Sequence, residues 1–428
     1  MPENFQKWIH IVIEEKKEKL LIIGASIGQL PLLIRAKNQG IHVTVATIPG
    51  DYVCLPLADD VIYCDIYDRD GIVAEAEKRK ITAVTSDQND LMNPTVAYVS
   101  EKLKLPGNRF NTVMSYCNKN QFRDLCEKAG IPVPKHVAVN SVEYDFSEFD
   151  CRLPWIVKPA DSQSSIGVKK IDAPKELLGA VEFALSQSPT NSAIVEEFFP
   201  GKEIVCEGFV DEGKYYLLSF ADRRYFDIPD LMIPSQTIFP SVISRDILDT
   251  IVDYESRLAA YTKPSFAIVH SEYLVNEVTG EIRIVESALR GGGVYISSDL
   301  IPLCTGIDIN EILLNKARGI RVDVEKVFLS RKNGASAYIC FYLPNGIIEE
   351  IRGAEELKSM SWVHRAYIDD IKVGDHTVPM TYKGARKGPI LLKGHDREDI
   401  ERNISKVQKM LEIYVRNPEG NVSGILWD

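Results

Sequence analysis

The stretch that decides the fold is WIVKPADSQSSIGVKKI, residues 155–171, in which a short apolar run ends in a lysine. Residues 155–157 are typical of a buried strand, Lys158 follows them, and small polar residues fill the loop from 162 to 167. Backbone N–H groups and hydroxyls in such a loop can converge on an anion such as phosphate. A plain β-hairpin with a soluble tip is the alternative. The rest of the chain has to decide between the two.

The composition is that of an ordinary globular protein, and its charge argues against two classes of partner. The chain has 428 residues, of which 45% are hydrophobic and 26% are charged, so several domains are expected. The net charge of −11 disfavours nucleic acid and anionic membranes as partners, because both would repel the protein. Small anionic ligands remain compatible, since local lysines and magnesium can bind them.

The cysteines and the N-terminal segment indicate a cytoplasmic location. None of the eight cysteines forms a C-x-x-C pair, and this usage is typical of reduced, mostly buried thiols. No run approaches the roughly 18 consecutive apolar residues of a membrane span. The charges of the N-terminal segment follow its apolar patch, which is the wrong order for a signal peptide.

Residues 20–107 alternate short β-rich runs with helical segments. Such alternation predicts a parallel sheet covered on both faces. The first turn, GASIGQL at 24–30, lacks the G-x-G-x-x-G spacing, and no acid ends the second strand, so the sequence favours a structural or substrate-facing turn over NAD binding. The predicted strands are 20–24, 42–47, 61–64 and 81–85, and the predicted helices are 29–38, 71–80 and 93–103.

A helix is predicted at residues 245–261, and the hairpin that follows it is predicted to bring two glutamates together. A three-residue connection at 278–280, with Gly280 in the left-handed conformation, pairs Glu272 with Glu286 across the strands. Strand periodicity places His270 on the same face as Glu272. Directly opposed carboxylates repel each other unless a cation lies between them, and oxygen ligands of this kind suit Mg²⁺.

The residues after this hairpin help to choose between a metal site and a solvated pair of glutamates. In the alternative, the register is shifted by one residue and both carboxylates point to solvent. Arg290 stands beside the glycine run 291–293, and an arginine next to flexible backbone is suited to bind phosphate or carboxylate. This neighbourhood favours the metal site.

Four motifs in this order resemble the ATP-grasp superfamily. They are NKNQFRDLCEKAGIPVP at 118–134, WIVKPADSQSSIGV at 155–168, IVEEFFPGKE at 194–203 and IVESALRGG at 284–292. The first is predicted to be a helix with an apolar stripe of Phe122, Leu125 and Cys126, ended by Gly130 and Pro132. Residues 365–400 resemble the closing domain of carboxylate–amine ligases such as L-amino acid ligases, and of biotin carboxylase. The resemblance implies an α/β and α+β fold in three parts: a Rossmann-like domain at 1–115, an ATP-grasp domain at 116–325 with subdomains at 116–190 and 191–325, and a small α+β lobe at 326–428.

The resemblance also implies which residues bind ATP. Two lysines would contact the α- and β-phosphates, the loop would cover the phosphates, a hinge would lie beside adenine, and a glutamate would bind the ribose. Taken alone, a lysine at a helix start is usually solvated and paired phenylalanines usually belong to a core, so these roles depend on the whole set. The implied residues are Lys119, Lys158, Ser162, Ser164, Ser165, Gly167, Glu196, Glu197, Phe198, Phe199 and Glu203.

The same resemblance implies the metal and catalytic residues. Glu272 and Glu286 would hold Mg²⁺, and Glu286 and Arg290 would act in catalysis. The proline-rich segment 221–241 is expected to reach the site, and its Arg223 or Arg224 could bind a substrate carboxylate; His270 and Arg290 are the other substrate-binding candidates. One departure affects the metal count, because the family's E-x-N pattern has Ala288 in place of asparagine. Ser287, water or a substrate oxygen could supply the missing ligand.

The implied activity is that of an ADP-forming carboxylate–amine ligase with an acyl-phosphate intermediate. Its partners would be ATP, Mg²⁺, a small carboxylate and an amine, and a homodimer is left open as the assembly. Two alternatives stay open: an enzyme of the carboxylase or carbamoyl-phosphate type that activates bicarbonate, and a nucleotide-binding regulatory protein without catalysis. The chain has no G-x-x-x-x-G-K-[ST] motif, which excludes P-loop chemistry.

Overall fold

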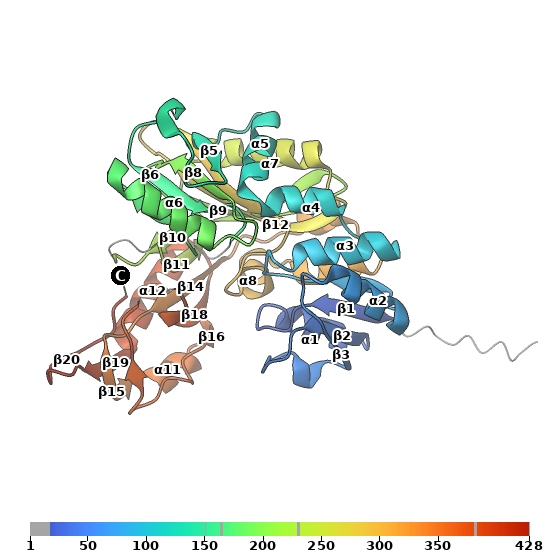
Figure 1. The fold of residues 1–428 in the computed structure, drawn as a ribbon. Coiled ribbons are helices and arrows are strands. Elements are labelled where there is room, and N and C mark those ends of the chain that lie inside the picture. The colour runs from blue at the N-terminus through green and yellow to red at the C-terminus, as the bar shows by residue number, and fades with distance from the viewer. Residues whose placement is uncertain (1–17, 150, 163–165, 229–231, 381–382, 428) are drawn as a thin grey trace, which may run out of the picture.

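The computed structural model describes residues 18–149, 151–162, 166–228, 232–380 and 383–427. In Figure 1 the N-terminal residues (blue) lie at the lower right, the C-terminal residues (red) lie at the lower left, and the middle of the chain lies above both. No helix in the described ranges has the length and apolar character needed to cross a membrane.

The N-terminal unit is a four-stranded parallel sheet in the order β3-β2-β1-β4, as the alternating pattern predicted. Successive side chains of β1 enter different cores, with Leu20 packing beside α1 and Leu21 beside α2 and α3. The sheet is therefore covered on both faces. The elements are β1 (Lys19–Ile23), α1 (Leu30–Asn38), β2 (His42–Thr47), β3 (Asp60–Tyr63), α2 (Arg69–Arg79), β4 (Ala83–Thr85) and α3 (Asn93–Leu103).

Two helices connect this unit to a small antiparallel sheet with the order β5-β8-β6-β7. The helix predicted after residue 118 is α5, whose cap Asn118 accepts a hydrogen bond from Gln121 N, and Gly130 follows its end with a left-handed φ of 69°. The elements are α4 (Phe110–Cys117), α5 (Lys119–Lys128), β5 (His136–Val139), β6 (Trp155–Pro159), β7 (Lys169–Ile171), α6 (Leu177–Ser186) and β8 (Ala193–Glu197).

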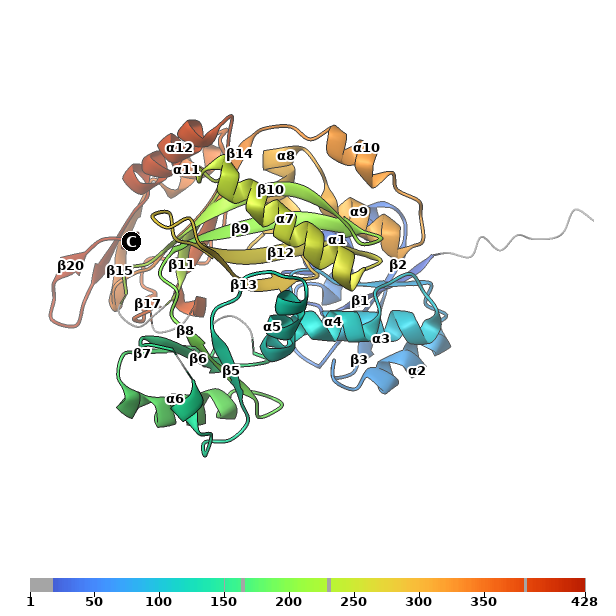
Figure 2. The ribbon, with the colours of Figure 1, turned by 90° about the horizontal axis from the view of Figure 1, so that it is seen from above.

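The largest sheet has eight strands in the order β13-β12-β9-β10-β11-β14-β18-β16. Helices cover both of its faces, with α5 and α7 packed in one core and α8 and α9 in another; α7 crosses the strands in Figure 2. Its strands are β9 (Lys202–Asp211), β10 (Lys214–Tyr225), β11 (Pro234–Phe239), β12 (Phe266–Val275), β13 (Ile282–Ala288), β14 (Ala335–Phe341), β16 (Val363–Ala366) and β18 (Lys387–Gly394).

The C-terminal residues divide between this sheet and a smaller one. The strands β14, β18 and β16 lie in the predicted C-terminal lobe yet extend the large sheet, because β14 is buried along its whole length and pairs with β11 on one side and β18 on the other. The smaller sheet has the order β17-β15-β19-β20. The division at residue 325 stays a prediction.

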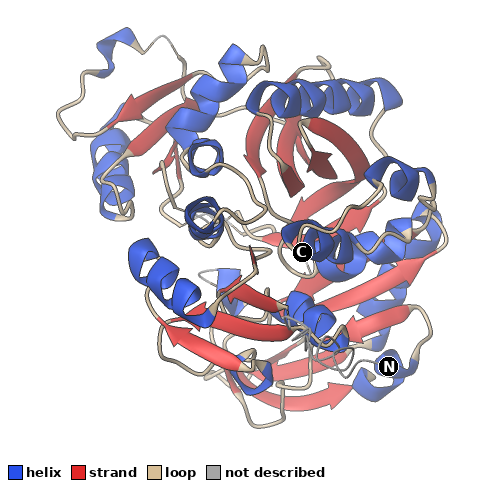
Figure 3. Ribbon diagram, turned by 90° about the vertical axis from the view of Figure 1, so that its right-hand side faces the viewer, coloured by secondary structure: helices blue, strands red, loops and turns tan. Residues whose placement is uncertain are grey.

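The remaining elements lie around these sheets, with helices layered over strands when the molecule is viewed from the side (Figure 3). A π-helical segment, Ile296–Leu300, follows the glycine run after β13. The other elements are α7 (Arg245–Thr262), α8 (Ile301–Thr305), α9 (Ile309–Ala317), α10 (Val324–Leu329), β15 (Gly346–Arg352), α11 (Ala354–Ser359), β17 (His376–Thr377), α12 (Arg397–Met410), β19 (Glu412–Arg416) and β20 (Val422–Ser423).

Candidate active site

The two predicted glutamates face each other on β12 and β13. Glu272 pairs with Glu286, as the sequence predicted. The connection is one residue longer than predicted, because Asn276 and Glu281 close it. A bulge between Glu272 and Tyr273 corrects this shift of one residue. Glu272 pairs with Glu286 and Tyr273 pairs with Ile284, so β13 has one extra residue between these two pairs. The predicted register is therefore correct at the glutamates and offset near the turn.

The two carboxylates differ in how much of their charge is already neutralised. Glu272 contacts Arg223 through Oε1, and His270 Nε2 lies 3.3 Å from the same oxygen. Although burial acts in the opposite direction, Arg223 and His270 hold the pKa of Glu272 well below its usual value. The side chain of Glu286 is 34% exposed, and its one ion pair among the described residues is with Arg290 Nη2 at 3.7 Å.

This arrangement fits a magnesium ion. The opposed carboxylates supply hard oxygen ligands, and Glu286 keeps oxygen atoms free of short contacts within the described part of the chain. Ala288 pairs with His270 and contributes no oxygen. The expectation that Ser287 could replace the missing asparagine is wrong, because Ser287 is buried and its partner is the Ser271 hydroxyl at 2.9 Å, on the opposite face of the strands.

Lys158 lies in a buried cluster of charges. Its Nζ is 2.5 Å from Glu196 Oε2, and Arg123 Nε donates to Glu196 Oε1 at 2.6 Å. Burial lowers the pKa of Lys158, and Glu196 only partly offsets this effect. Replacing Lys158 with alanine would therefore leave the buried Glu196 carboxylate without one of its two cations. Sequence reasoning missed Arg123, although it stands between the apolar residues of the α5 stripe.

The first residue of α5 reaches the loop that follows β6. Lys119 Nζ donates to the carbonyl of Ser162 at 2.6 Å, and Lys119 N donates to the carbonyl of Ala160. Gly167 has a φ of 74°, and a Cβ there would lie 2.7 Å from Pro159 Cγ, so glycine is required. The predicted Ser164 and Ser165 lie outside the described residues. The two lysines and the start of the loop are thus brought together.

The predicted hinge connects β8 to β9. The carboxylate of Glu196 points to Lys158 and Arg123, whereas Glu197 Oε1 accepts from Lys135 N at 3.1 Å. Phe198 N donates to the carbonyl of Pro154, and Phe199 is buried beneath the Arg283 guanidinium, which lies 4.9 Å from the ring centre.

Further along β9, Glu203 contacts Arg223 Nη1 at 2.6 Å and also the Tyr225 hydroxyl. Arg223 therefore bridges the predicted ribose-binding glutamate and the predicted metal ligand Glu272. Arg224, on the opposite face of β10, pairs with Glu401 of α12. Arg223 thus lies beside the glutamate pair, whereas Arg224 lies away from it.

Arg290 is fixed by a residue that sequence reasoning missed. Its Nε and Nη2 donate to the two carboxylate oxygens of Asp90 at 2.9 and 2.6 Å. Although burial acts in the opposite direction, Asp90 raises the pKa of the guanidinium above its ordinary value. Asp90 follows the last strand of the parallel sheet, the edge where such sheets commonly place functional groups, and that position was the available signal.

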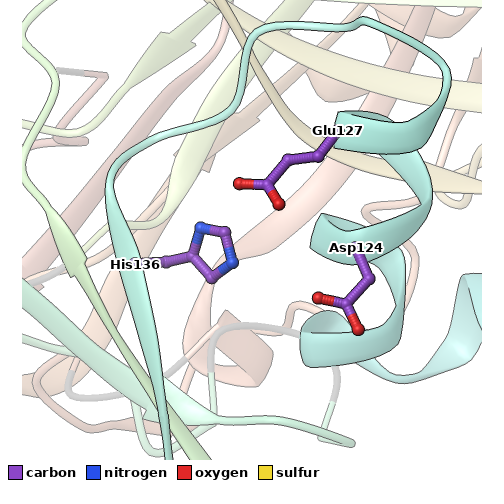
Figure 4. Close-up of side chains that lie close together, drawn as sticks. All are labelled: Asp124, Glu127 and His136. Carbon is purple, nitrogen blue, oxygen red and sulfur yellow. The ribbon is translucent and has the colours of Figure 1, made fainter.

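A separate group of possible metal ligands lies on α5 and β5. Asp124 and Glu127 extend from the helix toward His136, and one ligand atom of each residue lies within 4.8 Å of the others (Figure 4). Because these residues belong to α5 and β5, they are distinct from the pair on β12 and β13.

Two family models match the chain. Residues 151–298 match the ATP-grasp domain, and residues 339–416 match the L-amino acid ligase C-terminal domain 2. The D-alanine–D-alanine ligase of Hydrogenovibrio crunogenus is 27% identical over 171 residues, which are 39% of this chain and 54% of that protein. The alanine–anticapsin ligase of Bacillus subtilis is 24% identical over 269 residues, 57% of this chain and 55% of that protein. The chain thus spans about half the length of these curated relatives.

Solved structures show the same fold over most of the chain. The L-amino acid ligase from Bacillus licheniformis has a TM-score of 0.80 at 21% identity, covering 94% of this chain and 99% of that one. The phosphoribosylglycinamide synthetase from Anaerococcus prevotii has a TM-score of 0.74 at 20% identity, covering 93% and 99%. Identities this low establish the fold alone. The family models show that the chain contains an ATP-grasp domain, a domain whose ligases use ATP with Mg²⁺, and an L-amino acid ligase C-terminal domain 2.

Proposed function

We propose that this protein is an ADP-forming ligase that joins a small carboxylate to an amine at the cost of ATP. The observation that carries the proposal is the opposed pair Glu272 and Glu286, with Arg290 in reach of Glu286. The match of residues 339–416 to an L-amino acid ligase domain supports a carboxylate–amine reaction in particular.

The chemistry begins with a carboxylate, which is a poor electrophile. Its oxygen attacks the γ-phosphorus of ATP, the bond to the β–γ bridging oxygen breaks, and an acyl phosphate and ADP form. The amine then attacks the acyl carbon, the carbon–oxygen bond to phosphate breaks, and the amine loses a proton. The products are the amide, ADP and phosphate.

In this proposal the acidic residues bind magnesium and ribose, and the basic residues bind phosphate groups. Magnesium, held by Glu272 and Glu286, would neutralise charge on the phosphates. Lys119 and Lys158 lie where they can bind phosphate oxygens, and Lys158 would exchange part of its contact with Glu196 for the nucleotide. Arg290 would bind the transferred phosphoryl group or the acyl phosphate. The hinge at 196–199 and Glu203 would hold adenine and ribose.

Bicarbonate activation is the second candidate, because carboxylases share this fold. A biotin carboxylase from Campylobacter jejuni has a TM-score of 0.69 at 18% identity, covering 96% of this chain and 92% of that one. The match to the ligase C-terminal domain favours the amide-forming reaction over this alternative.

The test is phosphate and ADP release from Mg-ATP with pools of carboxylates and amines. Release that requires one carboxylate together with one amine supports the proposal. Release that requires bicarbonate instead would favour the second candidate. No release with any pool, from protein that binds ATP, would contradict catalysis and favour a regulatory nucleotide-binding role.

A further inference from the structure

The loop after β4, together with the first residue of α3, holds three consecutive residues of the segment that follows β13. Asn93 Nδ2 donates to the Leu289 carbonyl at 3.0 Å, the Arg290 guanidinium donates to Asp90 at 2.9 and 2.6 Å, and Gly291 N donates to Asp87 Oδ1 at 2.8 Å. The two segments therefore run in opposite directions. We call Asp87, Asp90 and Asn93 the clamp.

The clamp is itself fixed in the protein interior. Asp87 is 1% exposed, and its Oδ2 accepts hydrogen bonds from Ser297 Oγ and Asn310 Nδ2, both at 2.7 Å. Its backbone carbonyl accepts from Gln29 Nε2 at 2.7 Å. The next residue, Gln88, adopts a left-handed φ of 62°, a conformation that costs energy for a residue other than glycine and that clusters at functional sites. The surrounding contacts thus maintain a strained loop.

Asp90 occupies one edge of Arg290 and leaves another edge available. A guanidinium has five N–H groups, and Asp90 accepts from Nε and from one N–H of Nη2. The Gly291 carbonyl accepts from Nη1 at 3.1 Å. Within the described part of the chain, one N–H on each of Nη1 and Nη2 has no hydrogen-bond partner, so Arg290 keeps donors for a phosphate or carboxylate.

Asp90 also competes with Glu286 for the same cation. Arg290 Nη2 lies 2.6 Å from Asp90 Oδ2 and 3.7 Å from Glu286 Oε1. Glu286 and Arg290 are four residues apart, and without Asp90 the guanidinium can close on Glu286. In such an ion pair, Glu286 would no longer be free to bind magnesium and Arg290 would no longer be free to bind the phosphoryl group.

We propose that Asp90 is a positioning residue, which aims Arg290 at the reacting phosphoryl group and keeps Glu286 free for magnesium. This inference rests on the proposed function. It makes the N-terminal domain part of the catalytic arrangement, since a side chain from that domain orients a catalytic residue of the ATP-grasp domain.

The test compares Asp90→Asn with Asp60→Asn in the full-length protein. Asp60 pairs with Arg79 Nε at 2.7 Å in the same domain, so the control also removes the charge of an aspartate–arginine pair. In Asp90→Asn we expect kcat to fall at least about tenfold, the magnesium concentration for half-maximal activity to rise at least about threefold, and KM for ATP to stay within about threefold. The control should stay within about twofold in all three.

A second measurement does not require activity. Arg290 is 10% exposed, so phenylglyoxal, which modifies arginine, should label it slowly in the wild type. Mass spectrometry should show at least about threefold faster labelling of Arg290 in Asp90→Asn and no change in Asp60→Asn. A longer variant, Asp90→Glu, should displace the guanidinium and also lower kcat.

The outcomes separate this inference from the proposed function. Wild-type kcat, magnesium dependence and labelling in Asp90→Asn would overturn the positioning role while leaving the ligase proposal standing. Faster labelling of Arg290 in a protein that never releases ADP would support the clamp and contradict the proposed function. Equal losses in Asp90→Asn and Asp60→Asn would mean a general effect on the domain and would overturn the positioning role.

Discussion

Lys158 and Glu286 are both charged residues near the end of a strand, but their surroundings differ. Lys158 is 7% exposed and pairs with Glu196, whereas Glu286 is partly exposed and, among the described residues, forms one ion pair, at 3.7 Å from Arg290. The sequence predicted both residues as parts of a site. It could not predict the burial of Lys158, because the residues that neutralise and enclose it come from distant positions in the chain.

Glu286→Gln should separate nucleotide binding from turnover. The variant keeps the size of the side chain but removes a negative ligand. We expect Mg-ATP affinity to change by less than about tenfold, or about 1.4 kcal/mol, and turnover to fall at least about a hundredfold. Isothermal titration calorimetry and ADP release measure the two effects. Glu281→Gln in the same hairpin is the control, and near-normal turnover in Glu286→Gln would defeat the metal-site assignment.

Lys158→Met should weaken both stability and ATP binding. The variant leaves Glu196 with Arg123 as its remaining cation, so we expect the free energy of unfolding to fall by about 1–3 kcal/mol. Urea unfolding measures this loss. Lys170→Met, on the exposed strand β7 of the same hairpin, should change stability by less than about 0.5 kcal/mol. An unchanged stability together with lost ATP binding would show that the lysine is not needed by the fold.

At the scale of elements, a buried arginine connects the helix α5 to two sheets. Arg123 is fully buried, pairs with Glu196 of β8, and donates from Nη2 to the carbonyl of Val285 on β13 at 2.9 Å. Val285 is the extra residue of the bulge beside the glutamate pair. Helical periodicity predicted α5 but not these contacts, since periodicity identifies a buried face and not the partners of a charge on it.

The stability contributed by Glu196 should depend on pH. Although burial acts in the opposite direction, Arg123 and Lys158 lower the pKa of Glu196 from 4.5 to about 2. A folded-state pKa below the unfolded value gives stability that is complete above pH 4.5 and lost as pH falls toward 2, here about 3 kcal/mol.

This pH dependence is tested with Glu196→Gln, which cannot titrate at this position. Urea unfolding should show that the difference in free energy of unfolding between wild type and variant becomes smaller as the pH falls from 6 to 3. Glu197→Gln, at a more exposed neighbouring position, should show a smaller change. A gap that stays constant over this range would contradict the low pKa.

At the scale of the whole molecule, the sequence predicted the kinds of elements better than the contacts between distant parts of the chain. The parallel sheet, α5, α7 and the glutamate hairpin all follow from local periodicity and turn residues. The contact of Asp90 with Arg290 joins residues 200 positions apart, and no local pattern signals it. The extension of the large sheet by β14 was missed for the same reason, because strand order is a long-range property.

Mg-ATP should raise the thermal midpoint of the whole chain, because a ligand that binds the native state stabilises it. At a hundredfold excess over Kd the gain is about 2.7 kcal/mol. Differential scanning fluorimetry measures the shift, and NAD is the control, since the first turn lacks the dinucleotide spacing. An equal shift with NAD, or none with millimolar Mg-ATP, would contradict the nucleotide assignment.

The continuous eight-stranded sheet limits how this protein can be cut. A fragment that ends at residue 330 would lose β14, β16 and β18 and leave β11, a fully buried strand, with one unpaired backbone edge. Such an edge recruits strands from other molecules. We expect this truncated chain to elute as aggregates in size-exclusion chromatography, because the C-terminal residues complete the sheet on which the rest of the chain is built.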